Sequence, residues 1–145
     1  MSKALDFSLF RFEEPIATRW SDFDLLGHAN NAIYSTYLET GRIHYLETVG
    51  PWPWDKTGMV LARTEMDYLA ELKPSHQPVL YMRVARMGSK SMDIESVIAQ
   101  ADQPDLIFNH AKVVVVAFDQ ATKQTVAIPE DMRQKFIRYE PGLHE

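Results

Sequence analysis

Apolar and polar residues follow two different periods along the chain, and the change of period separates its predicted elements. Residues 13–20 are predicted to form a first strand, which ends in a polar loop over residues 21–28. Apolar residues then recur every three or four positions over residues 34–49, which predicts a long helix with one buried face. That face carries Tyr34, Leu38, Gly41, Tyr45 and Val49.

Both ends of the predicted helix carry residues typical of helix termini. Asn30 or Asn31 offers a side-chain cap at the start, and Gly50 followed by Pro51 ends the helix. Gly41 lies on the apolar face, where it costs about 1 kcal/mol of helix propensity relative to alanine. Because glycine has no side chain, we expect the helix to approach a sheet closely at this position.

Beyond the helix the period becomes two, which indicates strands with one buried face. Residues 88–89 predict a hairpin turn, and residues 103–105 predict another. The valine run at 113–116 favours a strand covered on both faces, and a short helix is predicted over residues 129–137. The four predicted strands cover residues 65–72, 80–84, 92–99 and 107–118.

This order of elements predicts an α+β fold in which one long helix covers an antiparallel sheet. The four later strands are expected to form a meander, each beside the next in sequence. One helix cannot cover the whole sheet and its edges, so a second copy of the chain is expected to cover part of them.

Composition narrows the class of protein. The chain has 145 residues, of which 46% are hydrophobic and 24% are charged, as expected of one globular domain. It has no cysteine, which excludes disulfides, zinc–thiolate and iron–sulfur sites, and a cysteine nucleophile. Its formal net charge of -5 is opposite in sign to that of most nucleic-acid-binding proteins.

The chain also shows no sign of membrane insertion or export. Its first ten residues lack the apolar core and cleavage site of a signal peptide. No apolar run approaches the about 20 residues that a membrane helix needs. We therefore expect a cytoplasmic protein with no membrane partner.

The loop before the long helix concentrates groups that can do chemistry. Asp22 and Asp24 stand two residues apart and are followed by Gly27, His28 and the two asparagines. The free N–H groups at a helix N-terminus can hold a carbonyl oxygen, and a nearby carboxylate can act as a base or a nucleophile. The structural alternative is that these residues cap the helix or that Asp22 pairs with an arginine.

The stretch RWSDFDLLGHANNAIYSTYLETGR, residues 19–42, resembles the signature of the 4-hydroxybenzoyl-CoA thioesterase-like branch of the hotdog-fold acyl-CoA thioesterases. The resemblance covers about residues 10–138 of a single domain spanning 1–145. It implies a hotdog fold, in which a five-stranded antiparallel sheet wraps around the central helix and a short C-terminal helix follows. It also implies a homodimer or homotetramer with active sites between subunits.

The resemblance also implies roles for individual residues. Asp24 matches the catalytic carboxylate, and the backbone N–H near Asn31 matches the group that polarises the carbonyl. Gly27 allows the tight turn into the helix, and Asp22 is a supporting residue. His28 holds the loop by hydrogen bonds, and the alternative is a direct role as proton donor. The expected activity is hydrolysis of an acyl-CoA thioester without a cofactor.

A second feature of the family is a hairpin that meets the coenzyme A tail. The resemblance places Arg86, Lys90 and Ser91 in this hairpin. Coenzyme A is polyanionic and this chain is net acidic, so binding would need such a local basic patch. The alternative is that these side chains are a solvated strand face.

Two other functions stay open at this point. One is a hotdog hydratase or dehydratase that acts on enoyl thioesters, and the other is a non-catalytic acyl-CoA-binding module. The five histidines show no metal-ligand spacing, so no metal site is expected. The acyl group, and the choice between coenzyme A and an acyl carrier protein, are not determined.

Overall fold

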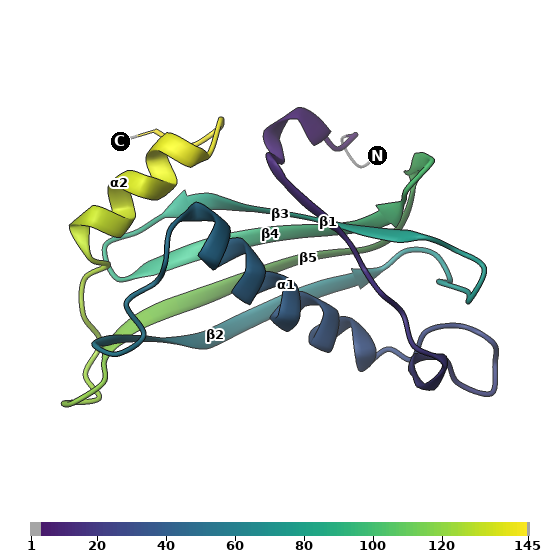
Figure 1. The fold of residues 1–145 in the computed structure, drawn as a ribbon, viewed down its shortest axis with the longest axis horizontal. Helices are drawn as coiled ribbons and strands as arrows, with labels where there is room; N and C mark the ends of the chain where they lie inside the picture. Colours follow the sequence, from purple (N-terminus) through teal and green to yellow (C-terminus); the bar gives the residue numbers. More distant parts are fainter. Residues whose placement is uncertain (1–3, 145) are drawn as a thin grey trace.

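A computed structural model describes residues 4–144, so residues 1–3 and 145 of the predicted domain lie outside it. Its sheet has the strand order β1-β3-β4-β5-β2 and every neighbouring pair is antiparallel (Figure 1). The long helix α1 crosses one face of this sheet, and the predicted α+β hotdog fold is confirmed. The elements are β1 Phe12–Pro15, α1 Ile33–Val49, β2 Thr57–Tyr68, β3 Pro78–Met87, β4 Ser91–Gln100, β5 Gln103–Asp119 and α2 Glu130–Tyr139.

The predicted four-strand meander is wrong in one respect. Strands β3, β4 and β5 are consecutive neighbours, but β2 lies at the far edge beside β5, and β1 takes the place beside β3. Alternation of apolar and polar residues predicts which face of a strand is buried. It does not predict which strands are neighbours, because it describes the side chains and not the backbone hydrogen bonds between strands. The sheet therefore ends in β1 on one side and β2 on the other.

Several predicted bounds also differ from the structure. The first strand ends at Pro15 rather than near residue 20, with one further backbone hydrogen bond from Ile16 to Pro78, and a short 3-10 turn follows at Trp20–Asp22. Strand β2 occupies Thr57–Tyr68 rather than residues 65–72. The turn predicted at 103–105 lies two residues earlier, since Gln103 already pairs with Gln100, whereas the turn at 88–89 is confirmed.

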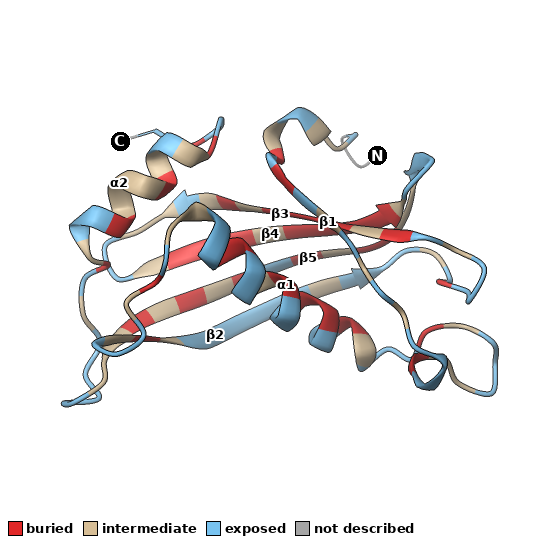
Figure 2. Cartoon of the chain, viewed as in Figure 1, coloured by how far each residue is buried: buried red, intermediate tan, exposed pale blue. Residues whose placement is uncertain are grey.

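Helix α1 packs on the sheet where Gly41 meets Leu80 of β3. A Cβ atom added to Gly41 would overlap the Leu80 side chain, which confirms the predicted close approach. Val49 at the end of the predicted face is only half-buried. The fully buried residues of the helix are Tyr34, Tyr37, Leu38, Gly41, Tyr45 and Leu46 (Figure 2).

The valine run is buried on one face only, which corrects the expectation of a strand covered on both. Val113 and Val115 point into the core beneath α1, whereas Val114 and Val116 on the outer face are half-buried. Part of that outer face is covered by the segment before β1, where Phe10 packs with Tyr81 and Val97. Within residues 4–144 no helix is both long and apolar enough to cross a membrane.

Candidate active site

The loop before α1 is closed by backbone hydrogen bonds across its base. An isolated bridge pairs Phe23 with Ala29, and the N–H of Asp24 donates to the carbonyl of His28 at 3.1 Å. The N–H of Gly27 donates to the carbonyl of Asp24 at 3.0 Å, and Gly27 adopts φ 84°, which favours glycine. The predicted tight turn at Gly27 is thus present, and it holds Asp24 in a defined loop.

Asp22 anchors the loop from inside the protein. Its side chain is buried, and Oδ2 accepts hydrogen bonds from the Tyr37 hydroxyl at 2.8 Å and from the Arg19 N–H at 2.9 Å. The Arg19 guanidinium lies 3.4 Å from Oδ1. Burial raises the pKa of the Tyr37 hydroxyl, and the hydrogen bond to Asp22 adds to this rise. These contacts give Asp22 the supporting position expected from the sequence.

Asp24 lies in a different environment from Asp22 and is half-exposed. Its Oδ1 accepts a hydrogen bond from the N–H of Leu26 at 2.9 Å, which fixes the carboxylate in the turn. No group within residues 4–144 donates to Oδ2, so one carboxylate oxygen is left for a water molecule or a substrate.

The start of α1 leaves one backbone donor free. Oδ1 of Asn30 accepts from the N–H of Ala32 at 2.9 Å, in a turn that precedes α1. The residue at the N-cap of α1 is Ala32, with no side-chain cap hydrogen bond, so the predicted asparagine cap is wrong. The carbonyl of Asn30 accepts from Ile33 at 3.0 Å. The N–H of Asn31 donates to no acceptor in the described part of the chain, and Asn31 is exposed. This is the backbone N–H to which the resemblance assigns the carbonyl-polarising role.

His28 and Asn31 meet at a small pocket. The pocket has a volume of about 200 Å³ and also includes Tyr34, Tyr68 and Leu69 in its lining. The ring of His28 is half-buried, and its Nδ1 lies 3.4 Å from the carbonyl of Ala29. Asp24 and Gly27 do not line this pocket.

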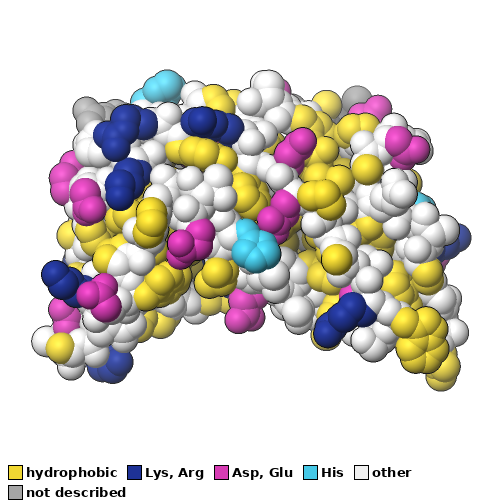
Figure 3. Space-filling view, viewed as in Figure 1, with side chains coloured by type: hydrophobic (Ala, Val, Ile, Leu, Met, Phe, Trp, Pro, Cys, Tyr) yellow, Lys and Arg dark blue, Asp and Glu magenta, His cyan; other side chains and the backbone are white. Residues whose placement is uncertain are grey.

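Large hydrophobic side chains surround the loop on its outer side. Trp20 is 93% exposed, and Leu25 and Leu26 are also largely exposed. Hydrophobic side chains are visible at this end of the molecule, at the lower right of Figure 3. Exposed apolar groups next to a polar site are typical of surfaces that bind another molecule.

The hairpin predicted to bind coenzyme A lies at the opposite end of the sheet from this loop (Figure 1). The ten residues of β3 separate the two, which corresponds to about 33 Å of strand. Lys90 is exposed at the hairpin tip, and Ser91 begins β4. A single chain therefore does not bring Lys90 and Asp24 together.

Arg86 is engaged within its own chain. Its Nε and one terminal nitrogen donate to the carboxylate of Asp93 at 3.0 Å and 2.9 Å, and the second contact of that nitrogen is with Ser91 Oγ at 3.3 Å. The hydrogen bonds from Arg86 hold the pKa of Asp93 below its usual value. This pairing favours the alternative of a structural strand-face residue for Arg86 over a phosphate ligand.

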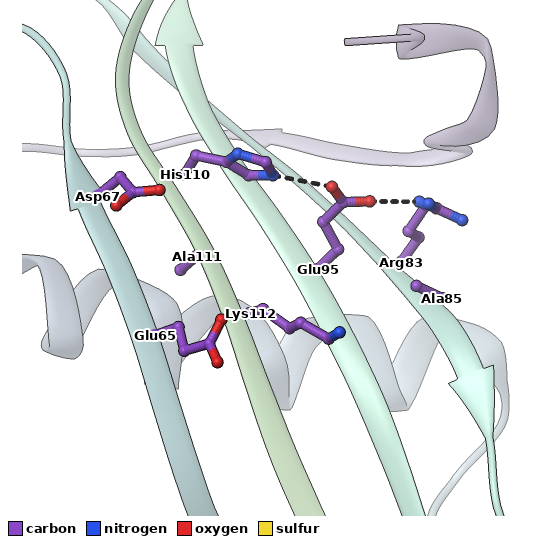
Figure 4. A pocket seen from close by; sticks show the side chains of 8 residues that line it. All are labelled: Glu65, Asp67, Arg83, Ala85, Glu95, His110, Ala111 and Lys112. Atoms are coloured by element: carbon purple, nitrogen blue, oxygen red, sulfur yellow. Dashed lines mark hydrogen bonds and ion pairs between the residues drawn. The ribbon is translucent and has the colours of Figure 1, made fainter. Parts of the chain in front are cut away.

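A polar cluster that the sequence did not single out lies on the outer face of the sheet (Figure 4). Glu95 accepts from Arg83 Nε at 2.8 Å and contacts His110 Nε2 at 2.8 Å, beside a cavity of about 330 Å³. The hydrogen bond with His110 lowers the pKa of Glu95, and the same contact raises the pKa of His110. Charged residues at alternate strand positions could have indicated the cluster. It lies on the face of the sheet opposite α1.

A sheet wrapped around a central helix, with an acidic loop that leads into the helix N-terminus, defines a hotdog-fold protein of the thioesterase type. The chain belongs to the thioesterase-like superfamily, whose family model matches residues 18–136. The family resemblance expected from the loop-and-helix signature is thereby confirmed.

Individual relatives agree with this assignment. The chain is 27% identical over 131 residues to the chloroplastic acyl-acyl carrier protein thioesterase ATL3 of Arabidopsis thaliana, and the match covers 88% of this chain and 68% of that protein. A second curated relative, an uncharacterised protein of Bacillus subtilis, is matched over only 58% of its length.

Solved structures show the same fold. A thioesterase from Thermus thermophilus, complexed with coenzyme A and Zn, is 26% identical with a TM-score of 0.78, and the match covers 91% of this chain and 96% of that one. The PA5185 protein of Pseudomonas aeruginosa has a TM-score of 0.84 at 24% identity over 95% of this chain and 97% of its own. The similarity to the PA5185 protein concerns the fold alone.

Proposed function

We propose that this protein hydrolyses an acyl-CoA thioester to the free acid and coenzyme A. The observation that carries the proposal is that the segment leading into α1 leaves two groups without a partner among residues 4–144: the Asn31 N–H and the Oδ2 atom of Asp24. An N–H donor and a carboxylate are the two groups that acyl transfer to water requires.

In the proposed mechanism, the thioester carbonyl oxygen accepts a hydrogen bond from the Asn31 N–H. Asp24 takes a proton from a water molecule as the water oxygen attacks the carbonyl carbon. The tetrahedral intermediate carries its negative charge on the oxygen that faces Asn31, where the positive end of the α1 dipole stabilises it. Its collapse breaks the carbon–sulfur bond, and the thiolate of coenzyme A leaves and is protonated.

A covalent route uses the same residues. The Asp24 carboxylate attacks the carbonyl carbon, coenzyme A leaves as the thiolate, and water then hydrolyses the mixed anhydride. A single turnover in ¹⁸O water separates the two routes. Label found in the Asp24 carboxylate, or trapping of the anhydride by hydroxylamine, supports the nucleophilic route. Label found only in the released acid, with no trapped anhydride, supports the general-base route.

We propose that two copies of the chain form the working unit. Strand β2 is a sheet edge, and Val60 and Leu61 on it are exposed at 46% and 53%. Pairing of two β2 edges in antiparallel fashion would extend the sheet and reverse the direction of the second copy. The hairpin of one copy, with Lys90, would then lie at the same end as the Asp24 loop of the other.

The test is a thiol-release assay with a panel of acyl-CoA thioesters, run on the wild type and on Asp24→Asn. We expect release of free coenzyme A by the wild type and loss of that release in the variant. Enoyl absorbance is followed in the same samples. A change in enoyl absorbance without thiol release would replace the proposal with a hydratase, and binding without any turnover would replace it with a binding module.

A further inference from the structure

Asn109 of β5 is a buried polar side chain without a partner. Its exposed fraction is 0%, and neither Oδ1 nor Nδ2 has a hydrogen-bond partner within the described residues. An unpaired buried polar group destabilises the folded state, so a carboxamide with both ends unpaired is a considerable cost to the fold. A ligand that forms hydrogen bonds with this carboxamide would remove that cost.

Asn109 lies next to a residue of the pocket at the start of α1. It stands opposite Ile98 of β4, a core residue, and opposite Tyr68 of β2, so these side chains share the inner face of the sheet. The rings of Tyr68 and Tyr34 meet edge to face with centroids 5.6 Å apart, and both line the pocket with His28. The carboxamide of Asn109 thus lies beside Tyr68, one of the two aromatic residues that line the pocket.

Of the two tyrosines that line the pocket, Tyr68 is free to move. Tyr34 is 3% exposed and fixed in the core, whereas Tyr68 is 51% exposed at the end of β2. Rotation of an exposed side chain is fast and requires no rearrangement of the core. Asn109 is the cross-strand partner of Tyr68, so displacement of the Tyr68 ring would extend the pocket of about 200 Å³ toward the carboxamide.

We infer that Asn109 is the specificity-determining residue of the acyl site, and that it selects a short acyl group bearing a hydroxyl. This inference rests on the proposed thioester hydrolysis. A hydroxyl both accepts and donates, so one oxygen can pair with Nδ2 and with Oδ1 together, which an alkyl chain cannot do. The pocket volume suits a short chain, because larger ligands require about 300 Å³ or more.

The experiment compares butyryl-CoA with 3-hydroxybutyryl-CoA as substrates in a thiol-release assay. The wild type is expected to show kcat/KM at least about 10-fold higher for the hydroxy substrate, because a site built to bond a hydroxyl rejects the analogue that lacks it. Asn109→Leu is expected to abolish or invert this ratio. Ser96→Ala, a matched control on the inner face of β4, should leave the ratio unchanged.

The outcomes are distinct. Equal rates on both substrates by the wild type, or the same ratio in Asn109→Leu as in the wild type, overturn the inference and leave the proposed hydrolysis intact. Absence of thiol release from every thioester overturns both. The wild-type ratio decides the matter even if Asn109→Leu fails to fold. If it folds, Asn109→Leu should also unfold at a higher temperature than the wild type, since it removes two unpaired buried atoms.

Discussion

The two aspartates of the loop have the same chemistry and opposite surroundings. Asp22 is buried and bonded to Tyr37 and Arg19, whereas Asp24 is half-exposed with one free oxygen. A buried and hydrogen-bonded carboxylate contributes to the stability of the fold, whereas a carboxylate with a free, accessible oxygen is available for reaction. Sequence neighbours can therefore have separate roles.

We expect the neutral variants of the two aspartates to separate rate from stability. Asp24→Asn should lower kcat/KM by about 10²–10⁴-fold, the usual contribution of a general base, with little change in the free energy of unfolding. Asp22→Asn should cost about 1–3 kcal/mol of stability because it disturbs a buried bonded group. Kinetics and urea unfolding of both variants measure this, and wild-type activity in Asp24→Asn would contradict the mechanism.

A pH dependence of stability is expected from Glu140, just after α2. Its buried carboxyl accepts from the Tyr45 hydroxyl, which itself accepts from the Val84 N–H at 3.0 Å. Burial raises the pKa of Glu140 from 4.5 to about 7. The folded state holds this proton more tightly than the unfolded state, so the contribution is complete below pH 4.5 and is lost as the pH rises through 7.

Between pH 4 and pH 8 the free energy of unfolding of the wild type should therefore fall by about 3 kcal/mol relative to Glu140→Gln. Urea unfolding at a series of pH values measures the difference. Glu47→Gln, at an exposed position of α1, is the control and should run parallel to the wild type. A constant gap between wild type and Glu140→Gln would show that this carboxyl does not titrate in the range.

At the scale of elements, the contact of α1 with β3 depends on the missing side chain of Gly41. We expect Gly41→Ala to destabilise the protein by about 1–3 kcal/mol, because overlap with Leu80 outweighs the gain of about 1 kcal/mol in helix propensity. Ser35→Ala on the exposed face of the same helix lacks this overlap. Thermal unfolding of both variants compares the effects, and a stabilised Gly41→Ala would mean that the helix can move away from the sheet.

The β3–β4 hairpin offers a test of coenzyme binding. Lys90→Ala should raise KM for an acyl-CoA by about 3- to 10-fold and leave kcat nearly unchanged, since the phosphates are remote from the reacting carbonyl. A pantetheine thioester lacks these phosphates and should be hydrolysed equally by both proteins. Lys56→Ala serves as a matched exposed lysine. Equal losses on both substrates would instead indicate a disturbed hairpin.

At the scale of the molecule, the exposed edge β2 and the separation of hairpin from loop both favour assembly. Leu61→Lys places a charge on this edge and should convert the expected dimer to a monomer with much lower activity. Ala101→Lys, in the exposed turn between β4 and β5, should remain dimeric. Light scattering with a parallel activity assay checks both, and a wild-type monomer with full activity would contradict the shared site.

The sequence by itself determined the elements and the loop chemistry. The period of the apolar residues predicted α1 and its close approach to the sheet at Gly41, because these depend on residues within a few positions of each other. The motif of residues 19–42 indicated the family, which the family model confirms. The predicted ends of the first strand and the turn before Gln103 differ from the structure, since both are set by pairing between strands.

Tertiary structure alone decided which strands are neighbours and which polar groups are left unpaired. Only the folded sheet places β2 beside β5, pairs Arg86 with Asp93, and separates Lys90 from Asp24. Only the folded structure shows that Asp22 is buried while Asp24 is half-exposed, and that the buried side chain of Asn109 has no hydrogen-bond partner within the described residues. The physical reason is that hydrogen-bond satisfaction and desolvation depend on residues far apart in sequence, which local periodicity does not report.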